Sequence, residues 1–159
     1  MEADTKLASE SGCYVLEAAD FDTLFRALRA HGYEVIGPRL EGEAIVYERM
    51  DSVAELPRGW KDEQEAGHYR LHRRSDSAYF GYVVGPRSWK HFLSPPTEQL
   101  WTVRATSSGL SFEPSPPPRQ RYAFLGVRAC EIAAMEVQDR VFLSGAVRDE
   151  ARSIRTAIQ

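Results

Sequence analysis

Apolar residues recur at helical spacing near the start of the chain. The positions that fall three or four apart, and so share one face of a helix, are Phe21, Leu24, Phe25 and Leu28. Asp20 precedes them as a suitable N-cap, and Gly32 supplies a stop. The spacing therefore predicts an amphipathic helix whose apolar stripe covers a sheet.

Short apolar segments separated by turn residues predict strands further along the chain. These segments are, in order, 33–36, 44–47, 68–72, 79–84, 100–105 and 110–113. The glycine- and proline-containing stretch 37–42 is expected to form a turn, and 56–60 a loop. Residues 107–109 are expected to close the last two strands into a hairpin. Ser88 can cap a short helix that runs through Phe92 and is closed by Pro95 and Pro96.

The last third of the chain predicts a strand followed by a helix. Residues 122–125 are expected to form the central strand, reached through the stiff proline run 114–118. A helix is expected over Cys130–Leu143, with Gly145 ending it and a third helix over 148–158. The apolar residues of the second helix include Ile132, Ala133, Met135, Val137 and Val141.

These elements predict a single α+β domain, in which a mostly antiparallel sheet is covered by the helices that begin near Asp20 and Cys130. Residues 1–13 are small and polar and are expected to form a flexible tail. The α+β domain is expected over 14–145, followed by a C-terminal helical segment over 146–159. A chain of 159 residues is long enough to bury a sizeable core.

Charge and composition narrow the class of protein. The net charge of −3 argues against nucleic-acid binding, and the basic runs 70–74 and 119–121 are interpreted as solvated edges or loops. No apolar run approaches the ~20 residues of a membrane span, and no secretory signal is visible. A cytoplasmic protein is expected, whose two cysteines, Cys13 and Cys130, stay reduced.

The candidate chemistry lies where the predicted strand 122–125 passes through Gly126 into a helix. A helix N-terminus presents unpaired N–H groups and a partial positive charge, which favour a thiolate. Cys130 is therefore a candidate metal ligand or nucleophile, and Arg128 can lower the pKa of its thiol or pair with an anion. The alternative interpretation of Cys130 is a small buried apolar residue.

The histidines are weaker candidates. His68 and His72 stand four apart, but on a strand that spacing spans about 13 Å, too far for one metal ion. His31 is expected near the end of the first helix, and His91 on the surface of a short one. The sequence shows no Ser/His/Asp order, phosphate-binding glycine loop or paired-carboxylate motif.

The segment around Cys130 resembles a family signature. Residues 126–134 read GVRACEIAA and residues 138–143 read QDRVFL. They are similar to the GVRPCDL motif, followed by a helix ending in DRVF, of iron–sulfur electron-transfer subunits related to those of sulfhydrogenase (its beta subunit) and of anaerobic sulfite reductase. Stretches 33–38, 56–59, 67–71 and 80–96 fall in the family's order, so the likeness covers roughly 20–145. Ala129 and Glu131 are mild departures from the proline and aspartate of the motif.

The resemblance implies a non-catalytic module of a cytoplasmic hydrogenase or reductase complex, with other redox subunits as its partners. It implies a cofactor-binding role for Cys130 and Arg128, with Cys130 as a ligand of a [4Fe–4S] cluster. Such a cluster needs about four cysteines, whereas the chain has two. We therefore expect no cluster in this chain alone, and expect the ferredoxin-like region that carries the clusters to lie beyond Gln159.

Two other functions stay open at the level of the sequence. One is a stand-alone thiol enzyme with Cys130 as nucleophile and Arg128 as anion binder. The other is a cluster-free interaction domain with a buried thiol.

Overall fold

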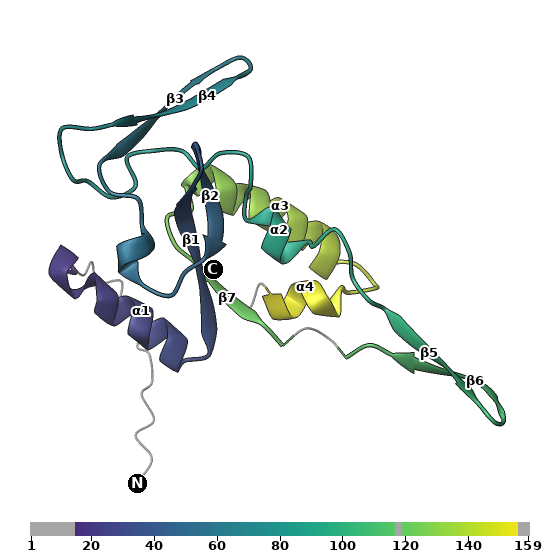
Figure 1. Ribbon diagram of the computed structural model, residues 1–159. Helices are drawn as coiled ribbons and strands as arrows, with labels where there is room; N and C mark the ends of the chain where they lie inside the picture. Colours follow the sequence, from purple (N-terminus) through teal and green to yellow (C-terminus); the bar gives the residue numbers. More distant parts are fainter. Residues whose placement is uncertain (1–14, 117–118, 156–159) are drawn as a thin grey trace, which may run out of the picture.

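A three-stranded sheet forms the centre of the fold (Figure 1). The computed structural model describes residues 15–116 and 119–155. β1 (Tyr33–Glu41) is the central strand, with β2 (Ala44–Arg49) antiparallel on one side and β7 (Arg121–Phe124) parallel on the other. The expectation that 122–125 form the central strand is therefore wrong, because β7 pairs with β1 alone and lies at the edge.

The expected turn over 37–42 is also wrong, since β1 continues to Glu41 and only Gly42 and Glu43 turn. Gly42 takes the left-handed φ of 59° that a two-residue hairpin requires. Pro38 is accommodated because its partner Tyr47 donates its N–H outward, to Arg87 O at 3.1 Å. The pair is thus a non-hydrogen-bonded one, and the absent proline N–H removes no bond to β2.

The two main helices pack on opposite faces of this sheet. Val35 and Ile36 are neighbours on β1 and so point to opposite sides. Val35 packs in one core cluster with Phe25 of α1 (Phe21–Ala30), while Ile36 packs in the other with Met135 of α3 (Ala129–Leu143). The predicted helix-covered α+β fold is confirmed. Asp20 takes the N-cap position of α1, after a short 3₁₀ turn over Ala18–Asp20, but its side chain makes no capping bond.

The second core cluster is completed by a short helix, α2 (Lys90–Leu93). Ser88 Oγ accepts a hydrogen bond from Lys90 N at 3.4 Å, which agrees with the predicted cap. The buried members of this cluster are Ile36, Tyr47, Trp89, Phe92, Leu93, Tyr122 and Met135.

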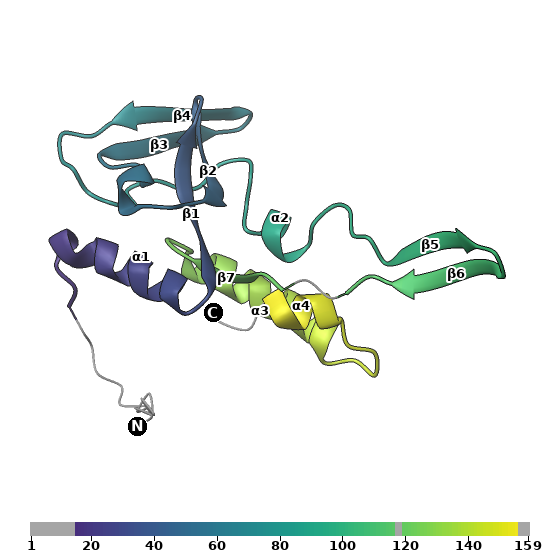
Figure 2. The same cartoon turned by 60° about the horizontal axis from the view of Figure 1, so that its bottom comes forward.

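Two further antiparallel ribbons branch from the body (Figures 1 and 2). The first pairs β3 (Trp60–Glu65) with β4 (His68–Arg73), and the second pairs β5 (Trp101–Thr106) with β6 (Gly109–Pro114). A short 3₁₀ turn, Val53–Glu55, precedes the first ribbon. The strand predicted over 68–72 and the hairpin predicted over 100–113 are confirmed.

Two predictions near the first ribbon are wrong. Trp60, expected in a loop, begins β3, whose remaining residues are polar and carry no apolar alternation. Residues 79–84, expected to be a strand, form a loop with only a single bridge, between Tyr79 and Arg58. Phe80 has a left-handed φ of 57°, which interrupts extended backbone, and the loop's polar groups bond to side chains instead.

The C-terminal part of the described chain forms α4 (Glu150–Arg155), shorter than the predicted helix over 148–158. Asp149 Oδ1 accepts from Arg152 N at 2.8 Å and so caps the helix. The Arg152 side chain is 2% exposed and forms an ion pair with Asp139 of α3 at 2.7 Å. The predicted tail over 1–13, Cys13 and Ile158 lie outside the described residues.

Candidate functional site around Cys130

Cys130 stands where the chain leaves β7 and enters α3. Leu125 N donates to Ile36 O at 2.8 Å, which extends the pairing with β1 one residue past the end of β7. Gly126 then takes a left-handed φ of 72°, and a Cβ atom there would lie 2.7 Å from the Phe80 ring. Only glycine fits this position, so the direction in which α3 starts is fixed by packing.

Glu131 anchors the first turn of α3. Its Oε2 accepts a hydrogen bond from Arg128 N at 2.9 Å, and the Tyr47 hydroxyl lies 3.1 Å from the same oxygen and from Gly126 O. Tyr47 is 1% exposed, and burial, followed by the charge of Glu131, raises the pKa of its phenol. The phenol therefore stays protonated and remains a hydrogen-bond donor to the turn.

Arg128 ties the same turn to the loop that follows the first ribbon. Its Nη2 donates to Tyr82 O at 2.6 Å, and the Tyr82 ring is buried. Burial raises the pKa of Tyr82. Arg128 thus makes a contact that positions the turn, while its predicted effect on the Cys130 thiol stays a prediction.

The Cys130 thiol is exposed. The interpretation of this residue as a small buried apolar side chain is therefore wrong. Cys130 follows Ala129 in the first turn of α3, where backbone N–H groups point out of the helix. The geometry presents a thiol to whatever approaches this end of the helix.

The chain by itself does not fit a complete [4Fe–4S] cluster, because such a cluster takes about four cysteine ligands and the sequence has two. Within residues 15–116 and 119–155, no three His, Cys, Asp or Glu side chains gather as a metal site. Cys130 fits at most one ligand position.

The outer face of α3 is apolar, which the sequence did not distinguish from its inner face. Starting at Cys130, spacings of four, three and four residues place Ala134, Val137 and Val141 on one exposed stripe. Val137 is 55% exposed and Val141 71%. Of the apolar residues expected to build this helix's packing, only Met135 is buried.

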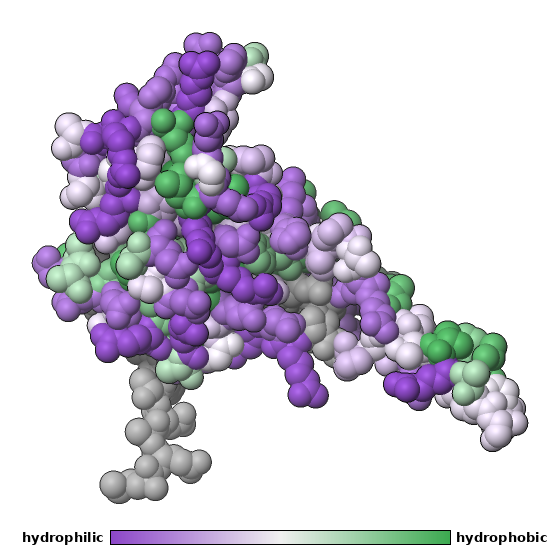
Figure 3. All heavy atoms as spheres, viewed as in Figure 1, coloured by the Kyte–Doolittle hydropathy of each residue, from purple (hydrophilic) through white to green (hydrophobic). Residues whose placement is uncertain are grey.

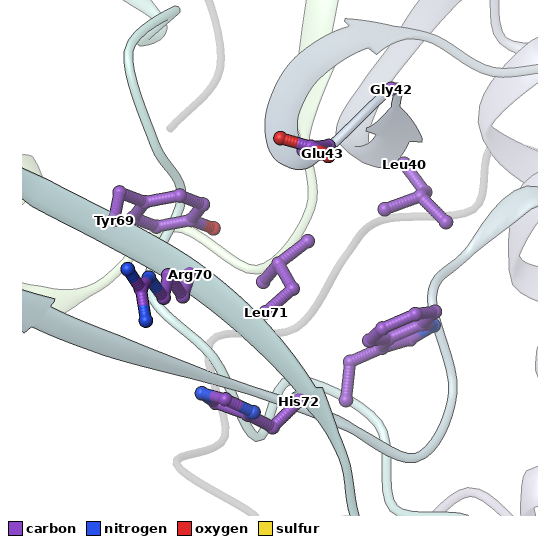
Figure 4. A pocket seen from close by; sticks show the side chains of 8 residues that line it. Leu40, Gly42, Glu43, Tyr69, Arg70, Leu71 and His72 are labelled. Carbon is purple, nitrogen blue, oxygen red and sulfur yellow. The ribbon is translucent and has the colours of Figure 1, made fainter.

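The histidine pair on β4 forms no metal site in the described structure. His72 Nε2 lies 2.7 Å from Glu63 Oε2, as an ion pair when the imidazole is protonated. A surface hollow of about 370 Å³ lies on the other side of β4, and in Figure 4 Leu71 and Tyr69 face Leu40 and Glu43 across it. The hollow is lined by Leu40, Gly42, Glu43, Trp60, Tyr69, Arg70, Leu71 and His72.

Among the described residues, no helix has both the length and the apolar character that crossing a membrane requires. The resemblance around Cys130 rests on the residues themselves, since comparison with protein-family models, curated proteins and solved structures found no match.

Proposed function

We propose that this chain is a scaffold and docking module of an iron–sulfur electron-transfer subunit, in a cytoplasmic hydrogenase or reductase complex, with no catalytic activity of its own. The observation that carries the proposal is the exposed Cys130 thiol on a firmly held turn. The likeness of residues 126–143 to the family signature supplies the chemical class.

The turn is held in a way that suits a ligand. Glu131 binds Arg128 N, Tyr47 binds Glu131, and Arg128 binds the Tyr82 carbonyl, so the backbone on both sides of Cys130 is fixed. A ligand or binding residue needs this kind of support, because a displacement of about 1 Å already weakens a site. The remaining ligands would have to come from outside the residues of this chain, and other subunits of the complex would carry out catalysis.

A thiol enzyme is the second candidate, and the exposure of Cys130 at a helix start favours it. Alkylation by iodoacetamide across roughly pH 5–10 tests this candidate in wild type and in Arg128→Ala. A midpoint below the usual value of about 8.5, raised by the substitution, supports an activated thiol. A midpoint that Arg128→Ala leaves unchanged removes Arg128 from that role.

The test of the main proposal is iron and sulfide content after anaerobic reconstitution. The chain alone is expected to stay colourless as a monomer, and a broad absorption near ~400 nm with bound iron and sulfide would contradict the missing-ligand argument. In an assembly that supplies further cysteines, Cys130→Ser is expected to lower the iron content or change the cluster's electron paramagnetic resonance spectrum. Cys13→Ser is the matched control, and equal spectra for both variants would remove Cys130 as a ligand.

A further inference from the structure

The β5–β6 ribbon has one apolar and one polar face. Residues directly opposite one another share a face in an antiparallel pair. The apolar pairs are Trp101 with Pro114, Val103 with Phe112, and Ala105 with Leu110. The alternate pairs, on the other face, are Thr102 with Glu113, Arg104 with Ser111, and Thr106 with Gly109. The sequence of the ribbon is thus that of a sheet that buries one side.

That apolar side is uncovered. Trp101, Val103, Leu110 and Phe112 are 58%, 52%, 66% and 63% exposed. The ribbon projects from the rest of the molecule, and apolar atoms gather on the projecting arm (Figures 1, 2 and 3). The four side chains leave on the order of 400 Å² of apolar surface in water, which is the size of patch that marks an interaction site.

The α3 stripe offers a matching surface. It runs through Cys130, Ala134, Val137 and Val141, carries no charged side chain of its own, and is exposed along its length. A two-stranded ribbon needs a helix or another strand against its apolar face to be stable. The ribbon stands clear of α3 of its own chain in both views (Figures 1 and 2), so a second molecule is needed to bring the two surfaces together.

We propose that the occupant is a second copy of this chain, in a two-fold dimer in which the ribbon of each protomer packs on the α3 stripe of the other. A reciprocal contact closes on itself and leaves neither surface free. Two such contacts bury on the order of 1,600 Å², which is the area of a standard stable interface. The inference holds whether or not Cys130 binds a cluster, since it uses only the apolar surfaces.

The experiment is sedimentation velocity over a range of protein concentrations. Wild type is expected to dimerise, and both Phe112→Glu on the ribbon and Val137→Glu on α3 are expected to raise the dimer dissociation constant at least about 10-fold. Ser111→Glu is the matched control, because it places the same charge on the polar face of β6, opposite Arg104, and should leave dimerisation unchanged. Circular dichroism of each variant checks that the fold is retained.

Mixing the two disruptive variants separates this arrangement from other dimers. Phe112→Glu keeps an intact α3 stripe and Val137→Glu an intact ribbon, so an equimolar mixture can form one of the two contacts and should associate more tightly than either variant alone. A wild type that remains monomeric overturns the proposal. So does a Val137→Glu variant that dimerises normally, which would indicate ribbon-to-ribbon pairing or binding by a different partner.

Discussion

The two ribbons have the same length and different surroundings. Each pairs two strands of six residues, β3 with β4 and β5 with β6, through a two-residue turn. The first is bound to the body of the protein, whereas the second projects from it (Figure 2). Since strand length and turn are alike, the difference must come from the side chains that each ribbon presents.

The β3–β4 ribbon is tied by polar side chains on its inner face. Asp62 Oδ1 accepts from Val83 N at 2.7 Å. The Tyr69 hydroxyl donates to Val83 O at 3.1 Å and accepts from Ile45 N at 3.4 Å, which joins the ribbon to both the 79–84 loop and the edge of β2. The outer face is charged and discourages further association, its residues being Lys61, Glu63, Glu65, His68, Arg70 and His72.

The β5–β6 ribbon has no comparable ties among its described contacts. Its polar bonds are internal, such as Arg104 to Glu113 at 3.3 Å and Thr106 to Gly109 O at 2.8 Å. Its other face is apolar and exposed to solvent. The comparison teaches that a hairpin with polar anchors is completed inside the chain, whereas an amphipathic one without anchors calls for an outside partner.

The largest effect is expected in the body to which the first ribbon is tied. Phe25 is 1% exposed and packs with Val35, Met50 and Leu56. Phe25→Ala should lower the free energy of unfolding by roughly 3–5 kcal/mol, because it leaves a cavity beneath α1. Urea unfolding measures it, with Leu24→Ala, at a partly exposed position of the same helix, as the control. A loss below ~1 kcal/mol for Phe25→Ala would contradict the packing of α1 on the sheet.

An intermediate effect is expected where the first ribbon meets the body. Tyr69→Phe removes the hydroxyl shared by Val83 O and Ile45 N, and should cost about 1–2 kcal/mol. Val103→Ala on the free ribbon should change stability by less than ~0.5 kcal/mol in the monomer, since its side chain is half exposed. Urea unfolding at a protein concentration that keeps the chain monomeric compares the two. Equal losses would mean that the second ribbon is tied as well as the first.

Local pattern predicted most of the elements, and failed where the structure departs from local rules. Helical spacing found α1 and α3, and turn residues found the β5–β6 hairpin. The strand β3 was missed because its polar side chains act as anchors and charges rather than as core. The 79–84 loop was mistaken for a strand because its apolar residues fill the core while Phe80 turns the backbone aside.

The site was predictable only in its local part. Helix-start rules placed Cys130 in a first turn and Glu131 as an acid near the positive end, and Glu131 does cap that end. Tyr47, which binds Glu131, lies 84 positions away in the chain, and no local pattern signals such a contact. The exposure of the α3 stripe was equally hidden, because α3 is apolar on more than one face and spacing cannot say which face is covered.

The smallest effect is expected at the base of the first ribbon, where Arg74 donates two hydrogen bonds to Asp76, at 2.8 and 2.6 Å. The Arg74 guanidinium lowers the pKa of Asp76 from its ordinary 3.8 to about 2. Because the folded state holds this carboxyl deprotonated to lower pH than the unfolded state, the clamp stabilises fully above about pH 4 and is lost as pH falls through about 2. The Asp76 carboxyl is exposed to solvent, so the effect is small.

Asp76→Asn should therefore lower the urea midpoint slightly near pH 5 and make no difference near pH 2. Carbon-detected nuclear magnetic resonance of the Asp76 carboxyl follows the same titration directly. In Arg74→Gln the titration should move up toward 3.8, because the guanidinium that holds the pKa down is gone. If Asp76 titrates near 3.8 in wild type, the clamp is open in solution, and the tied ribbon is held by Asp62 and Tyr69 without help from its base.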